Sequence, residues 1–147
     1  MSSMWSAIDA SASGLDAQRA RMEVAASNLA NADSVHGPNN QPYRRREVML
    51  ESSDPDGFGA TLTRASGTGV EAAGVKVTDV VEDQSPFGRR YEPSSPDADA
   101  DGFVATPNVS VPEEMVDMLG AARAYQANLA AIGVVKDTIQ KALDLAK

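Results

Sequence analysis

The stretch SVPEEMVDMLGAARAYQANLAAI, from Ser110 to Ile132, decides the fold. It opens with Ser110 and Glu113 in an S-x-x-E pattern, in which the two side chains can satisfy free backbone amides at a helix start. Pro112 suits the first turn of a helix. Beyond it, apolar residues recur at intervals of three and four. The stretch therefore predicts a long helix over residues 111–146.

The apolar residues of this helix form a seam of the kind that pairs helices in coiled coils. The seam consists of Met115, Met118, Ala122, Tyr125, Leu129, Ile132, Ile139, Leu143 and Ala146. Lys136 interrupts it once. Gly120 and Gly133 each cost the helix roughly 1 kcal/mol relative to Ala, unless they let a neighbouring helix approach closely.

A second helix with the same pattern is predicted over residues 1–33. Its seam consists of Trp5, Ile8, Ala12, Leu15, Met22, Ala26 and Leu29, with Arg19 as the break. It ends in SNLANADSVHGPNN, where Asn, Asp, Gly and Pro disfavour further helix. Neither seam has another long element to cover it. We therefore expect the two helices to pack on each other and to leave apolar surface for self-assembly.

Residues 34–109 have a different character, because they hold seven of the eight prolines. Alternating or β-branched runs predict strands at 43–50, 60–65, 74–81 and 89–93, and a short one at 103–106. The predicted fold class is α+β: long N- and C-terminal helices pairing as a coiled coil, with a small β-rich middle domain. The expected domains are 1–33 and 110–147, the two helices of an inner coiled-coil domain, and 34–109.

Composition excludes several classes of function. A net charge of −8 disfavours nucleic-acid binding, which needs a basic face. The chain has no cysteine, so disulfides and thiol catalysis are excluded. We expect no Sec-type signal peptide at the N-terminus, and no window reaches the ~18 apolar residues of a membrane span. The single histidine, His36, stands in a polar loop without a catalytic motif, so an enzyme is disfavoured and no cofactor is expected.

The acidic run PDADADGF raises a calcium-binding alternative. Asp97, Asp99, Asp101 and Gly102 match positions 1, 3, 5 and 6 of a calcium loop. Position 12 is Asn108, which lacks the bidentate carboxylate of Glu, and YEPSSP precedes the loop instead of a helix. An acidic turn leading into a short strand is the favoured interpretation.

Two further clusters have a plain and a functional interpretation. Tyr43 with Arg44, Arg45 and Arg46 is either an exposed strand or a lateral contact for an acidic neighbour. The asparagines near the seams, Asn28, Asn31 and Asn128, either end or decorate helices or form inter-helix hydrogen bonds that fix register.

Four motifs together resemble one protein family. SNLANADS at 27–34 is similar to the N-terminal signature of bacterial flagellar rod and hook proteins. EEMVDMLGAARAYQANLAAI at 113–132 is similar to the C-terminal signature. PYRRREV at 42–48 and the stretch 77–109 narrow the resemblance to proximal rod members. Ser95, where the family usually has His, is a departure.

The resemblance implies a non-enzymatic, axial subunit of the flagellar basal body. Its terminal helices would form an inner layer around the export channel, assembling helically into a torque-transmitting shaft. Its partners would be other rod subunits, the basal-body junction proteins and the flagellar type III export apparatus. Its place would be the rod in the periplasm. Another axial subunit is the nearest alternative.

The residues expected at subunit interfaces or in helix packing come from both seams and both signatures. They are Trp5, Ile8, Leu15, Met22, Asn28, Leu29 and Asn31, and then Met115, Met118, Arg123, Tyr125, Gln126, Asn128, Leu129, Ile132, Ile139 and Leu143.

Overall fold

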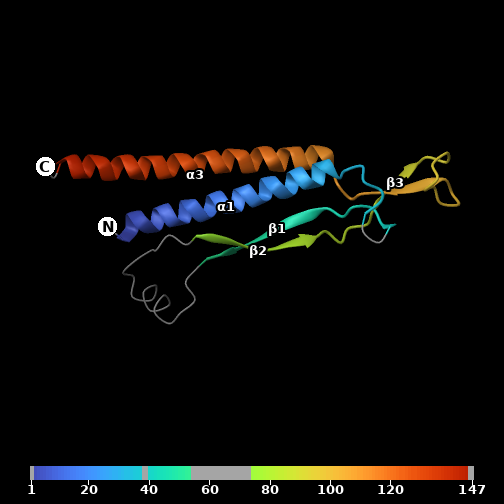
Figure 1. Cartoon of the computed structure of the whole chain (residues 1–147), viewed down its shortest axis with the longest axis horizontal. Helices are drawn as coiled ribbons and strands as arrows, with labels where there is room; N and C mark the ends of the chain where they lie inside the picture. The colour runs from blue at the N-terminus through green and yellow to red at the C-terminus, as the bar shows by residue number, and fades with distance from the viewer. Residues whose placement is uncertain (1, 38–39, 54–73, 146–147) are drawn as a thin grey trace, which may run out of the picture. The chain divides into compact units, whose positions relative to one another are not determined.

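The computed structural model describes residues 2–37, 40–53 and 74–145 (Figure 1). The order of elements is α1 (Ser2–Ala30), β1 (Arg46–Ser52), β2 (Val75–Glu82), β3 (Gly88–Tyr91), β4 (Phe103–Thr106) and α3 (Val111–Leu145). The predicted α+β class is confirmed, and so are the two terminal helices. The strand predicted at 60–65 lies outside the described residues.

Contacts divide the chain into two compact units. The first comprises Met1–Arg19, Leu50–Thr78 and Ala122–Lys147, and the second comprises Ala20–Met49 and Asp79–Ala121. Each unit contains part of both helices and part of the β1–β2 pair. These units cut across the three segments drawn from the sequence, so the division into an inner and a middle domain stays a prediction.

The start of α3 and the end of α1 are both explained by local hydrogen bonds. The amide of Glu114 donates to the carbonyl of Ser110 at 3.0 Å, which closes the first turn of α3 beside Pro112. At the end of α1, the Ser27 carbonyl accepts from the backbone amide of Asn31 at 3.2 Å and from the Asn31 side-chain amide at 2.8 Å. Asn31 therefore acts as a helix terminator.

The face that α1 and α3 bury is made of small and polar residues. On α1 the buried residues are Ala17, Ala25 and Asn28, and on α3 they are Glu114 and Ala121. In the first unit, a Cβ added to Gly14 would lie 2.8 Å from the side-chain nitrogen of Asn128, so the two helices approach closely there. In the second unit, Asn28 and Glu114 are hydrogen-bonded.

Part of the seam expected from the sequence is exposed in this single chain. Trp5 is 63% exposed, Met115 49%, Leu129 55% and Leu143 61%, although all were assigned to the seam. Other members of the seam are half-buried, namely Ile8, Leu15, Met22 and Leu29 on α1 and Met118, Ala122, Tyr125, Ile132 and Ile139 on α3. The most buried positions of α3, Glu114 and Ala121, lie beside the seam. Small residues permit close helix approach, and heptad analysis weighted by large apolar residues overlooks them.

The β3–β4 hairpin lies in the second unit, and the acidic run connects its two strands. Its strands are antiparallel, with Gly88 opposite Thr106 and Tyr91 opposite Phe103. The Tyr91 and Phe103 rings make an edge-to-face contact at 5.2 Å, and Val104 is buried. Gly102 has φ +81°, a conformation that glycine adopts without strain.

Strands β1 and β2 pair as a two-stranded sheet. In the first unit, this sheet is joined to α1 because the amide of Val75 donates to the Ser13 hydroxyl at 3.0 Å. In the second unit, the amide of Asp83 donates to the carbonyl of Arg45 at 2.8 Å. Among the described helices, none has an apolar stretch long enough to cross a membrane.

Candidate functional site

The best-defined site is a buried polar hub in the second unit, centred on Asn28 of α1. Its side-chain amide donates to the Arg46 carbonyl at 2.9 Å and to the Glu114 carboxylate at 3.0 Å. Its oxygen accepts from the Arg46 amide and from the Tyr43 hydroxyl, each at 3.0 Å. Because Asn28 is only 1% exposed and fully hydrogen-bonded, it ties α1 to the start of β1 and to α3.

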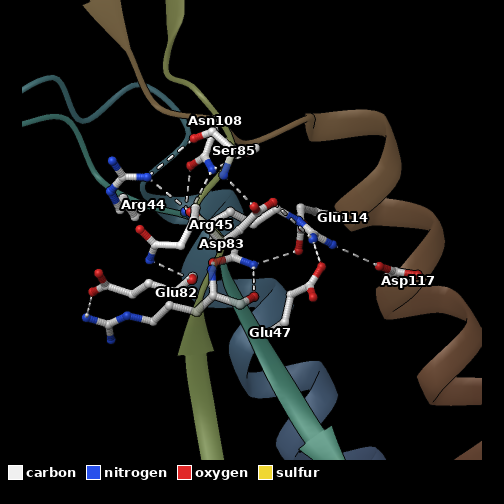
Figure 2. A network of polar contacts seen from close by, with 12 residues as sticks. Arg44, Arg45, Glu47, Glu82, Asp83, Ser85, Asn108, Glu114 and Asp117 are labelled. Carbon is white, nitrogen blue, oxygen red and sulfur yellow. Dashed lines mark hydrogen bonds and ion pairs between the residues drawn. The ribbon is translucent and has the colours of Figure 1, made fainter.

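Glu114 is the acidic centre of the hub and is 2% exposed. Besides Asn28, its carboxylate accepts from Nε of Arg45 at 2.5 Å. Arg45 also pairs with Glu47, and its guanidinium lies 3.5 Å from Asp117 (Figure 2). A buried carboxylate needs such a partner, since an unpaired charge in this position is strongly destabilising.

The backbone around Arg45 is held by Asn108, from the segment that precedes α3. The Arg45 amide donates to the Asn108 oxygen at 2.8 Å, and the Asn108 side-chain amide donates to the Ser85 hydroxyl at 2.8 Å. Nη1 of Arg44 donates to the carbonyl of Asp83 at 3.1 Å (Figure 2). The hub therefore joins α1, β1, the 83–85 turn and the start of α3.

The charges of the hub alter the ionisation of two of its members. Burial, the largest influence, lowers the pKa of Arg45, but hydrogen bonds and charges from Glu114 and Glu47 outweigh it and leave that pKa raised. The pKa of Asp83 is lowered, mainly because the Ser85 backbone amide donates to its carboxylate, with further help from Arg45 and Arg44. Both groups are thus held in their charged forms.

The structure gives the three adjacent arginines separate roles. Arg45 has a side chain only 18% exposed and belongs to the hub, and Arg44 stacks on Phe87 at 4.3 Å. Arg46 is 47% exposed and lies 4.0 Å from Glu82. The lateral contact through Tyr43, Arg44, Arg45 and Arg46 stays a prediction, and Arg46 is the one exposed residue of the four.

Two carboxylates of the acidic run, Asp97 and Asp99, have partners within the protein. Asp99 accepts hydrogen bonds from the amides of Phe103 and Asp101 and pairs with Arg89 at 2.7 Å. Asp97 instead lies 3.1 Å from His36. In the parts of the chain that the structure describes, no cluster of three acidic, histidine or cysteine side chains is arranged to hold a metal ion. The run is the turn that closes the β3–β4 hairpin.

A second feature is the apolar surface that α3 leaves exposed. Met115, Leu119, Leu129 and Leu143, which we call the outward seam, are each about half exposed or more. Successive members are four, ten and fourteen residues apart, which keeps them on one side of the helix. Large apolar side chains gathered on one side of a helix indicate a surface for another protein.

Comparison with known proteins shows which family the chain resembles. Residues 8–38 match the family described as flagella basal body rod protein, and residues 100–145 match the C-terminal region of the flagellar basal body rod FlgEFG proteins. The chain is 45% identical to the flagellar basal-body rod protein FlgC of Escherichia coli O6:H1, with 93% of each covered. It is 42% identical to FlgC of Bacillus subtilis, covering 95% of the chain and 96% of that protein.

The chain belongs to the FlgC family. FlgC of Borreliella burgdorferi is 36% identical, with 95% of each chain covered. As a FlgC family member, the protein is a structural subunit of the proximal rod in the flagellar basal body, and it assembles with other rod components. The resemblance read from the sequence is thereby confirmed.

In this FlgC family member, the sequence analysis identified Asn28 of the hub and missed Glu114, the buried carboxylate. Asn28 makes an inter-helix hydrogen bond, as predicted. Glu114 was not singled out by the sequence analysis. A signal was present, because Glu114, Ala121 and Asn128 are spaced by seven and mark a second heptad beside the apolar one.

Proposed function

We propose that different residues of this FlgC subunit serve stability and assembly. The polar hub stabilises the second unit, and the outward seam of α3 docks on helices of neighbouring rod subunits. Exposure of that seam is the observation that carries the proposal. Leu129 and Leu143 are 55% and 61% exposed, whereas the buried apolar residues in the described part of the chain are Ala17, Ala25, Val104 and Ala121. Burying a large apolar side chain contributes about 1.5–3 kcal/mol, so neighbours gain from covering the seam.

The remaining parts of the proposal follow the family. The protein acts without catalysis, and it reaches the periplasmic rod through the flagellar type III export apparatus. Other rod subunits and the basal-body junction proteins are its partners. Trp5 of α1, 63% exposed, adds to the docking surface, and exposed Arg46 is a candidate for a lateral contact with an acidic neighbour.

Substitution of Leu129 by Asp tests the proposal. Because Leu129 is exposed, Leu129→Asp should leave the helical content and unfolding midpoint of the free protein nearly unchanged. A buried charge at the docking surface should abolish rod incorporation and motility while the subunit is still exported. Ala131→Asp, also at an exposed position of α3 but on a different side, is the control. Normal rod yield and motility in Leu129→Asp would contradict the proposal.

A further inference from the structure

A second apolar stripe of α3 lies on a different side from the outward seam. Val116 is 68% exposed, Val134 66% and Leu145 90%. Val116 and Val134 are eighteen residues apart, and Leu145 follows eleven residues later, so about five and then about three turns separate them on one line of the helix. We call this line the flank of α3.

The beginning of the flank is a hollow with an acidic rim. It is lined by Arg45, Pro112, Glu113, Val116 and Asp117. Arg45 is largely covered and is already paired with Glu114 and Glu47, and it lies 3.5 Å from Asp117, which among the described residues leaves Glu113 as the unshared carboxylate of the rim. Glu113 is exposed and Asp117 is 48% exposed, so the rim presents carboxylates around an apolar floor formed by Pro112 and Val116. It suits a partner that brings an apolar side chain next to a cation.

The end of the flank has that chemistry. Lys141 lies on it, seven residues after Val134 and four before Leu145. Lys141 is exposed, and within the described residues no ion pair or hydrogen bond of its side chain is found. The end of α3 thus presents one lysine between two protruding apolar side chains, complementary in charge and shape to the hollow.

We propose that the hollow at the beginning of α3 receives the end of α3 from a second copy of this chain. Leu145 of one copy covers Val116 of the next, and Lys141 faces Glu113 and Asp117. This joins two different surfaces of identical chains, a heterologous contact that generates helical rather than closed assemblies. The inference rests on the proposed docking role of α3 and adds the partner and the orientation.

Disulfide trapping tests the contact directly, because the chain has no cysteine of its own. Two preparations of the full chain, Val116→Cys and Leu145→Cys, are mixed and oxidised with diamide. We expect a mixed dimer, identified by mass, that forms faster than either homodimer. Leu119→Cys mixed with Leu145→Cys is the matched control, since Leu119 is also a large exposed residue of the same helical region.

Reversing the charges at the proposed contact provides a second test. Adding Lys141→Glu to the Leu145→Cys chain should slow trapping by roughly two- to fivefold, as expected for an exposed charge pair. Adding Glu113→Lys to the Val116→Cys chain should restore the rate. Circular dichroism verifies that each variant is folded.

Absence of the mixed dimer, or equal trapping by Leu119→Cys, would overturn the inference. So would a Lys141→Glu effect that Glu113→Lys does not rescue. Leu129 is not altered in these variants. The inference can therefore fail while Leu129→Asp still blocks rod incorporation, which would leave the proposed docking role of the outward seam intact.

Discussion

At the scale of single residues, this protein is held by hydrogen bonds where most proteins of its size use a thick apolar core. Asn28 uses both its donor hydrogens and its acceptor oxygen to bond to three residues on two other segments, Tyr43 and Arg46 at the start of β1 and Glu114 of α3. In the described residues, no buried side-chain polar atom lacks a partner. A fully satisfied network of this kind specifies one arrangement, whereas a partly satisfied one is strongly destabilising.

The hub predicts different outcomes for two adjacent glutamates. Glu114→Gln removes the charge that Arg45 faces and should lower the free energy of unfolding by about 2–4 kcal/mol, as expected when one partner of a buried ion pair is lost. Glu113→Gln, at an exposed position, should change it by less than about 0.5 kcal/mol. Urea unfolding followed by circular dichroism compares them. Equal free energies of unfolding for the two variants would show that the hub does not stabilise the fold.

Asp99 should make the stability of the folded protein sensitive to acid. Hydrogen bonds from the Phe103 amide, and then Arg89 and the Asp101 amide, lower its pKa below the ordinary 3.8. A carboxylate with a lowered folded-state pKa contributes stability that is present above its unfolded pKa and lost as pH falls through the folded value. Stability should therefore decline as pH falls below about 4.

Asp99→Asn should flatten that decline, because an amide does not titrate. Asp101→Asn serves as the control and should keep the wild-type pH dependence. Thermal unfolding between pH 2 and pH 6 measures both. A decline in Asp99→Asn as steep as in the unaltered chain would contradict the assignment.

At the scale of elements, the ends of helices and hairpins were predictable and the faces of the helices were not. The start of α3 and the strand at 103–106 follow from local signals, Pro112 in the first turn and Gly102 in the acidic turn. The buried face of α3 depends on Gly14 and Asn28, which are distant in sequence. The periodicity of apolar residues alone could not tell which of two adjacent positions is the more buried, Leu129 or Asn128, and Met115 or Glu114.

Two helical glycines should respond in opposite ways to alanine. A Cβ at Gly120 meets nothing within 4 Å, so Gly120→Ala should stabilise the free protein by up to about 1 kcal/mol through helix propensity. A Cβ at Gly14 would lie 2.8 Å from Asn128, so Gly14→Ala should destabilise it. Urea midpoints of the two variants give the comparison. Destabilisation by Gly120→Ala would mean that α3 is covered there in the free chain.

At the scale of the whole molecule, the exposed apolar residues of α3 make sense only in an assembly. Membership of the FlgC family was predictable because both signatures and the middle segment are recognisable in the sequence. Which of the large apolar residues pack inside the chain was not predictable, because the sequence analysis placed them at subunit interfaces or in helix packing without distinguishing the two. In the structure the most buried helix positions are small or polar, and Met115, Leu119, Leu129 and Leu143 are exposed.

The central claim is that this outward seam docks on neighbouring rod subunits. Electron cryomicroscopy of basal bodies assembled with this subunit tests it most directly, by measuring the exposure of the four outward-seam side chains in the rod. We predict that helices of neighbouring subunits cover all four, while the Asn28–Glu114 hydrogen bond persists inside each subunit. A rod in which the outward seam still faces solvent would contradict the account.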